Sequence, residues 1–104
     1  MVNSSNQYII DNLHNNIEEL KIYGSELNLD NLPNSIKKLK VRDYEKELNN
    51  LPNSIEYLKL EDYHLKLEDY HLKIKKIPKN LKTLKCHKNY PYIDDFKDYE
   101  IITY

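Results

Sequence analysis

The decapeptide LPNSIKKLKV at residues 32–41 recurs as LPNSIEYLKL at residues 51–60. Weaker copies are LHNNIEELKI at residues 13–22 and IPKNLKTLKC at residues 77–86. Successive copies begin 19, 19 and 26 residues apart, and together they divide most of the chain into four units. A period of this length indicates a repeat architecture, in which each unit packs against its neighbours.

Each copy carries the same order of apolar residues. Its last apolar residues alternate with polar ones, which predicts a short strand with one buried face, while Pro and Asn at its start argue against a helix there. A unit of 19 residues cannot bury its apolar side chains alone, so we expect stacked units with parallel strands and one continuous core. By alignment with Ile22, Val41 and Leu60, Cys86 is predicted to be a core thiol rather than a nucleophile.

The third unit is longer by seven residues because LKLEDYH occurs twice, at residues 58–64 and 65–71. Both flanking copies stay in phase, so we interpret the insert as a slipped duplication that forms a bulge on one side of the coil. Its doubled acidic and imidazole groups match no recognised metal-site spacing, and we predict no metal at these residues, which are Asp62, His64, Asp69 and His71.

The string I-x-x-L-x-V/L followed by L-x-x-L-P-x-S-I resembles the leucine-rich repeat. LPNSI in particular resembles the short FNIP-type variant of repeat proteins from amoebae and giant viruses. The resemblance covers about residues 9–89, but EKELNN and GSELNLDN replace the Phe-Asn-x-Pro-Ile signature. The asparagine-ladder position of ordinary leucine-rich repeats is matched only by Asn89, since the other units hold Ser25, Tyr44 and Tyr63.

Pattern and resemblance together predict an α/β-type repeat solenoid. We expect about four parallel strands on a concave side and a mostly irregular or short-helical convex side, where the bulge of the third unit is compatible with a helical turn. Residues 1–104 are taken as one domain with units that start near residues 13, 32, 51 and 77. Residues 1–12 and 90–104 are predicted to be the N-terminal and C-terminal caps.

Composition excludes several function classes. Charged residues make up 32% of the chain, yet the net charge is only −1, so the whole chain has no field that points to nucleic acid or membrane. We expect no membrane span and no signal peptide, because no apolar run is long enough and the first residues lack a basic region. One cysteine suits a reducing compartment, so we expect a cytoplasmic protein.

No motif in the sequence points to catalysis. Nucleophile triads, HExxH and glycine-rich phosphate loops are absent, and Gly24 is the only glycine. We therefore predict that the protein is not an enzyme and has no cofactor.

The outward positions of the predicted strands carry the strongest functional signal. Their central position is lysine in all four units, which predicts a column of lysines across the sheet. These outward positions hold six basic and two acidic residues, a net charge of +4 that leaves −5 for the rest of the chain. The candidate partner-binding residues are Lys21, Tyr23, Lys38, Lys40, Arg42, Tyr57, Lys59, Lys85 and His87.

The preferred hypothesis is a non-enzymatic module that binds an acidic protein segment on this face. The alternative is a structural fragment or truncated repeat protein without binding activity of its own, in which the lysines serve solubility and discourage aggregation. A nucleic-acid strand is a lesser candidate. The predicted state is a monomer or a weak association through the solenoid ends.

Overall fold

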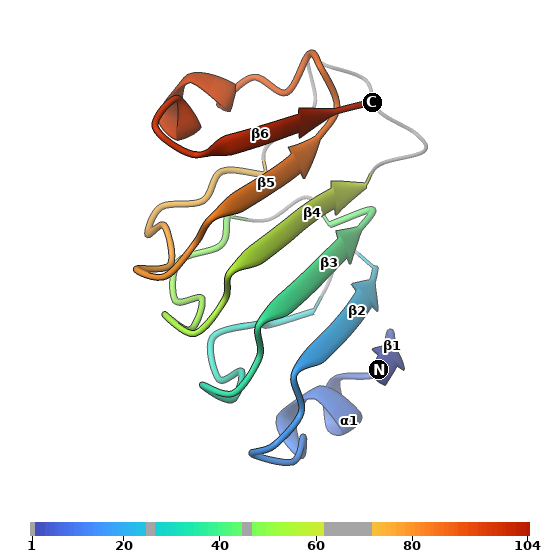
Figure 1. The fold of residues 1–104 in the computed structure, drawn as a ribbon. Helices are drawn as coiled ribbons and strands as arrows, with labels where there is room; N and C mark the ends of the chain where they lie inside the picture. Colours follow the sequence, from blue (N-terminus) through green and yellow to red (C-terminus); the bar gives the residue numbers. More distant parts are fainter. Residues whose placement is uncertain (1, 25–26, 45–46, 62–71) are drawn as a thin grey trace.

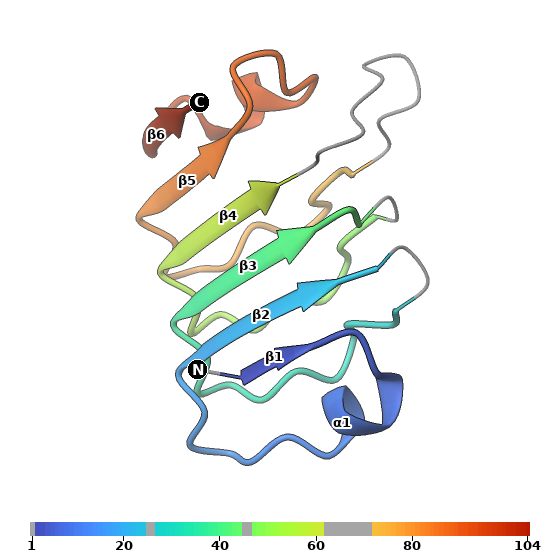
Figure 2. The ribbon, with the colours of Figure 1, turned by 90° about the vertical axis from the view of Figure 1, so that its right-hand side faces the viewer.

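The computed structural model describes residues 2–24, 27–44, 47–61 and 72–104. Within them the chain forms one six-stranded sheet whose strand order follows the chain, and every pair is parallel. Figures 1 and 2 show the strands stacked along the molecule from β1 to β6. The elements are β1 (Val2–Ser4), α1 (Gln7–Asp11), β2 (Glu19–Tyr23), β3 (Lys38–Arg42), β4 (Tyr57–Glu61), β5 (Thr83–Cys86), the 3-10 helix η2 (Ile93–Phe96) and β6 (Glu100–Thr103).

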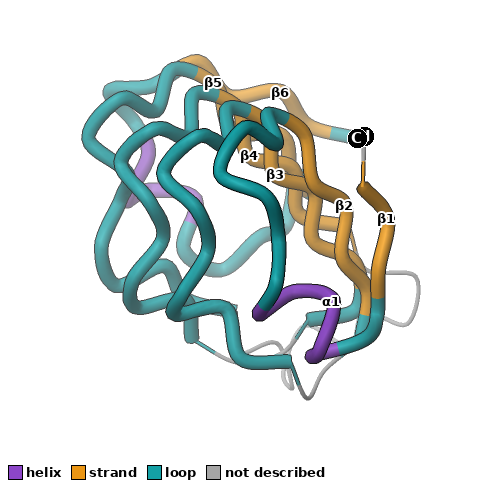
Figure 3. Tube along the Cα trace, turned by 90° about the horizontal axis from the view of Figure 1, so that it is seen from below, coloured by secondary structure: helices purple, strands orange, loops and turns teal. Residues whose placement is uncertain are grey.

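The view along the stack shows a coil with strands on one side and mostly loops on the other (Figure 3). The alternating residues of the strands point into the space between these two sides, and those of β2 to β5 are almost completely buried: Leu20, Ile22, Leu39, Val41, Leu58, Leu60, Leu84 and Cys86. The loop side contributes the apolar residues that precede each repeat, namely Ile10, Leu29, Leu48 and Ile74. The predicted repeat solenoid with a parallel sheet is confirmed.

Both predicted caps add a strand to the four predicted ones. In β1, Val2 pairs with Leu20 of β2, and in β6, Ile101 pairs with Leu84 of β5. The residue segments 1–12 and 90–104 lack the alternating strand pattern of the repeat, so the strands in them were not predicted. Phe96 closes the C-terminal end, where its side chain is 0% exposed.

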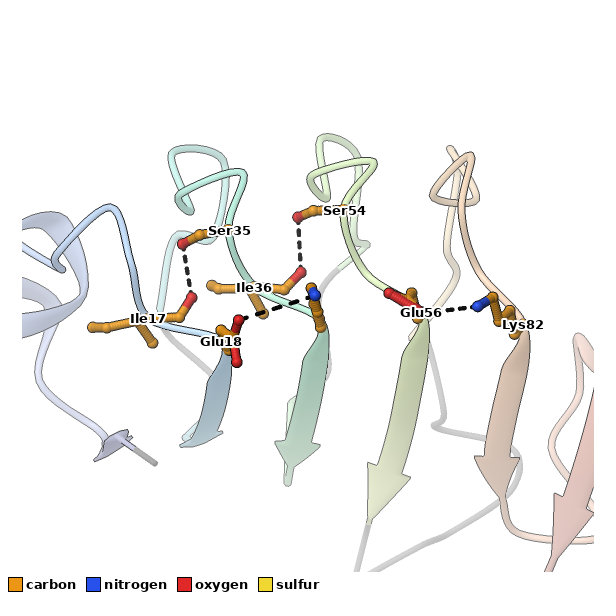
Figure 4. A network of polar contacts seen from close by, with 8 residues as sticks. Ile17, Glu18, Ser35, Ile36, Ser54, Glu56 and Lys82 are labelled. Atoms are coloured by element: carbon orange, nitrogen blue, oxygen red, sulfur yellow. Dashed lines mark hydrogen bonds and ion pairs between the residues drawn. The ribbon is translucent and has the colours of Figure 1, made fainter.

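The LPNSI segment ties consecutive units together. The hydroxyl of Ser35 donates to the carbonyl of Ile17, and that of Ser54 donates to the carbonyl of Ile36, each at 2.7 Å (Figure 4). In the other direction, the side-chain oxygen of Asn34 accepts from the backbone N–H of Ser54 at 3.2 Å. The Asn and Ser of the motif therefore supply hydrogen-bond partners for backbone groups of the neighbouring coil. These backbone groups lie outside the strands, so the hydrogen bonds of the sheet do not pair them.

Two buried tyrosines in the turns that follow β3 and β5 form hydrogen bonds to the backbone. The Tyr44 hydroxyl donates to the Leu27 carbonyl at 2.9 Å, and the Tyr90 hydroxyl donates to the Leu72 carbonyl at 2.7 Å. The phenol hydroxyls of these two residues thus provide hydrogen-bond donors for buried backbone carbonyls.

The duplicated segment lies mostly outside the described residues, and so do the predicted bulge and the residues Asp62, His64, Asp69 and His71. The described chain breaks off after Glu61, within the first copy, and resumes with the buried Leu72. Ile74 then forms a parallel bridge with Leu48 of the preceding unit. The third unit thus rejoins the coil on its loop side.

Candidate binding face of the sheet

The predicted lysine column is present on the outward face of the sheet. Strand register places Lys21 beside Lys40, Lys40 beside Lys59, and Lys59 beside Lys85. Parallel strands lie about 4.8 Å apart, so the column crosses β2 to β5 in steps of about that length. All four lysines are partly buried, as expected for stems that lie along neighbouring side chains with the ammonium group toward solvent.

The other predicted binding residues flank the column. On one side, Tyr23 pairs with Arg42, and Arg42 pairs with Glu61. On the other side, Lys38 pairs with Tyr57. Tyr23 is 40% exposed, which makes it the most accessible aromatic residue of β2 to β5.

His87 directly follows β5 and is engaged by its own surroundings. Its Nδ1 accepts a hydrogen bond from the backbone N–H of Asn89 at 3.0 Å. The ring also meets Tyr104 edge to face, with centroids 6.2 Å apart. The hydroxyl of Tyr104 in turn donates to the Leu60 carbonyl. His87 therefore belongs to the packing of the C-terminal end as well as to the outward face.

Ion pairs divide the basic residues of this face into two groups. Lys59 Nζ lies 2.8 Å from Glu61 Oε1, and Lys38 Nζ lies 3.8 Å from Glu19 Oε1. Arg42 pairs with Asp43 at 3.9 Å. Among the described residues, no ion pair is formed by the remaining column lysines, which are Lys21, Lys40 and Lys85.

The pKa of the Glu61 carboxylate reflects the positive charges around it on this face. Its burial acts to raise the pKa of Glu61, but the hydrogen bond from Lys59 and the positive charges of Lys59, Lys21 and Arg42 outweigh burial and leave the pKa lowered. The charge of Lys21 thus reaches across two strands to Glu61. This part of the face stabilises an anion held within it.

The last strand extends the face with residues that the sequence pattern did not identify. Ile102 stands beside Lys85 at the end of the column and is 40% exposed. Glu100 stands beside Thr83 and accepts a hydrogen bond from its hydroxyl at 3.0 Å. Residues 90–104 were predicted to be a cap, and only the observed pairing with β5 places these two side chains on the face.

Other candidate chemistry is weaker. Cys86 is fully buried, as predicted, and burial raises the pKa of its thiol to about 11. Over the described ranges, no three side chains of His, Cys, Asp or Glu are grouped to hold a metal ion. None of the helices in that part of the chain has the length and apolar character to cross a bilayer.

The family model of the FNIP repeat matches residues 23–63. This range contains both LPNSI segments together with β3 and β4, so the predicted FNIP-like repeat is confirmed there. Comparison with curated proteins and with solved structures gave no match.

Proposed function

We propose that the chain is a non-enzymatic interaction module that binds an acidic protein segment on the outward face of its sheet. The observation that carries this proposal is the lysine column, in which Lys21, Lys40 and Lys85 form no ion pair among the described residues. The FNIP match supports a repeat module, a class that presents extended surfaces for binding. One buried cysteine fits a cytoplasmic location.

The face combines charge with contact area. Exposed ion pairs contribute about 0.2–1 kcal/mol each, so three of them give roughly 1–2 kcal/mol that weakens as salt rises. Tyr23 and Tyr57 lie on opposite sides of the column and offer amphipathic rings of the kind enriched in interfaces. Such a surface favours an acidic partner and speeds its encounter.

The test uses two variants with the same change in net charge. The column variant carries Lys21→Gln, Lys40→Gln and Lys85→Gln. The control variant carries Lys76→Gln, Lys79→Gln and Lys97→Gln, which alter three exposed lysines in turns outside the strands. Binding of a fluorescent glutamate-rich peptide is measured by anisotropy at low salt, after circular dichroism shows that both variants fold.

We expect the column variant to bind the peptide roughly tenfold more weakly than wild type, and the control variant to match wild type. Equal weakening in both variants would reduce the effect to net charge and would refute a site on this face. A single-stranded RNA probe that outcompetes the peptide would assign the face to nucleic acid instead.

The alternative, a structural coil with no binding activity, is favoured by one observation. Glu19 and Glu61 stand on the face itself and pair with Lys38 and Lys59, so part of its positive charge is already neutralised. On this alternative wild type and both variants fail equally to bind the peptide. Size-exclusion chromatography of wild type would then test association through the solenoid ends.

A further inference from the structure

The spacing of the column distinguishes between kinds of acidic segment. Five in-register positions cross β2 to β6, namely Lys21, Lys40, Lys59, Lys85 and Ile102. At about 4.8 Å per strand they span about 19 Å. Figures 1 and 2 show the strands β2 to β5 fanning only gently, so their outward positions form one row.

A helix matches this length better than an extended chain does. Helical residues i, i+3, i+7, i+10 and i+14 form one stripe that rises about 21 Å, which stays within about 2 Å of the column. Alternate residues of an extended strand advance about 6.6 Å each and cover about 26 Å over five positions. An extended segment therefore falls about 7 Å out of step by the fifth position.

The charge at each position of the column then predicts which kind of residue the partner helix carries opposite it. Lys21, Lys40 and Lys85 offer ammonium groups with no ion pair among the described residues. Lys59 already holds Glu61 at 2.8 Å. Ile102 presents an apolar side chain, 40% exposed, at the far end.

From this pattern, and resting on the proposed function, we infer that the partner segment is an α-helix lying across the strands. Its stripe carries carboxylates at i, i+3 and i+10, a neutral residue at i+7, and an apolar residue at i+14. Its N-terminus lies over β2 and its C-terminal part over β6. A helix about 10–12 Å wide is broad enough to contact both flanking rows, where Tyr23 and Tyr57 lie.

Three synthetic peptides of matched length test the inference. The stripe peptide is alanine-rich and glutamine-rich, with Glu at i, i+3 and i+10 and Leu at i+14. The scrambled peptide has the same composition and helicity, but its three Glu residues are spread around the helix. The proline peptide keeps the stripe sequence and replaces a residue near its centre with Pro, which breaks the helix.

Anisotropy titrations at low salt compare the peptides on wild type, the column variant and the control variant. We expect the stripe peptide to bind wild type at least about fivefold more tightly than the other two, and its helicity by circular dichroism to rise on binding. The column variant should lose this preference, and the control variant should keep it.

A double-mutant cycle checks the alignment of the helix. Glu→Gln at i+10 of the stripe peptide should couple with Lys85→Gln, and the same peptide change should not couple with Lys21→Gln. Coupling to both lysines alike would overturn the proposed alignment.

The outcomes separate the inference from the proposed function. If all three peptides bind wild type equally and the column variant weakens them all, the acidic-segment function stands and the helix is refuted. Preference for the proline peptide also refutes the helix and assigns the face to an extended segment. If the column variant binds every peptide as wild type does, both the function and the inference fail.

Discussion

Tyr44 satisfies a buried backbone group with a single hydroxyl. Burial and, to a smaller extent, the charge of Asp30 raise the pKa of Tyr44, so the phenol stays protonated and donates to the Leu27 carbonyl. Tyr44→Phe removes the donor and leaves that carbonyl unsatisfied, which should lower the free energy of unfolding by about 1–2 kcal/mol. Urea denaturation measures the change.

The matched control for Tyr44 is Tyr8→Phe, because the Tyr8 side chain is 75% exposed. We expect this change to stay within about 0.5 kcal/mol. If both variants lost the same stability, the buried hydrogen bond of Tyr44 would have no special role.

Cys86 should make the fold sensitive to alkali. Burial raises the pKa of the folded thiol from 9.0 to about 11. The unfolded chain therefore loses this proton at lower pH than the folded chain, and the contribution is complete below pH 9 and falls away as pH rises toward 11. The loss from this group is about 2–3 kcal/mol at most.

The reference for Cys86 is Cys86→Val, because Val41 occupies the equivalent buried position in β3. Between pH 9 and 11, wild type should lose more stability than the valine variant, because only wild type carries the buried thiol. Parallel loss in the two proteins would show that the thiol does not titrate with unfolding.

At the scale of one repeat, apolar spacing predicted the strand and its buried residues, because burial imposes a period that the sequence displays directly. The hydrogen bonds of LPNSI were not predictable in the same way. Ser54 and its acceptor Ile36 are 18 residues apart, and their contact depends on how one coil sits on the next. The sequence therefore identifies the motif, but only the structure shows that its serine donates a hydrogen bond to the preceding coil.

The duplicated segment gives a test at the same scale. Deletion of residues 65–71 restores a unit of 19 residues, the period of the first two intervals. We expect a folded protein of equal or higher stability, because shortening a connection changes closure entropy by less than about 1 kcal/mol. Thermal unfolding followed by circular dichroism measures this, and a loss of cooperative unfolding would show that the fold requires the second copy.

At the scale of the molecule, the sequence predicted the column but not the pairing within it. The alignment of Lys21, Lys40, Lys59 and Lys85 in one column follows from the repeat, whereas the Lys59–Glu61 ion pair depends on rotamers and local burial. The strands at the two ends, β1 and β6, were not predicted for a related reason. Each forms by pairing with the strand of a neighbouring unit, so it needs no repeat pattern of its own.

The C-terminal end offers the last prediction. Phe96 is 0% exposed, and its ring centroid lies 6.5 Å from that of Tyr90 and 6.0 Å from that of Tyr99. Phe96→Ala removes the centre of this cluster and should cost about 3–5 kcal/mol. Each strand pairs only with its sheet neighbours, so the damage should concentrate in β5 and β6.

Native-state hydrogen exchange locates that damage. In Phe96→Ala, amides of β5 and β6 should lose protection while those of β2 and β3 keep most of theirs. Ile102→Ala is the control, because Ile102 lies in the same C-terminal strand but belongs to the outward face rather than the core. Equal loss of protection in all strands would mean that the coil unfolds as one cooperative unit, in which the C-terminal aromatic cluster stabilises every repeat rather than its neighbours alone.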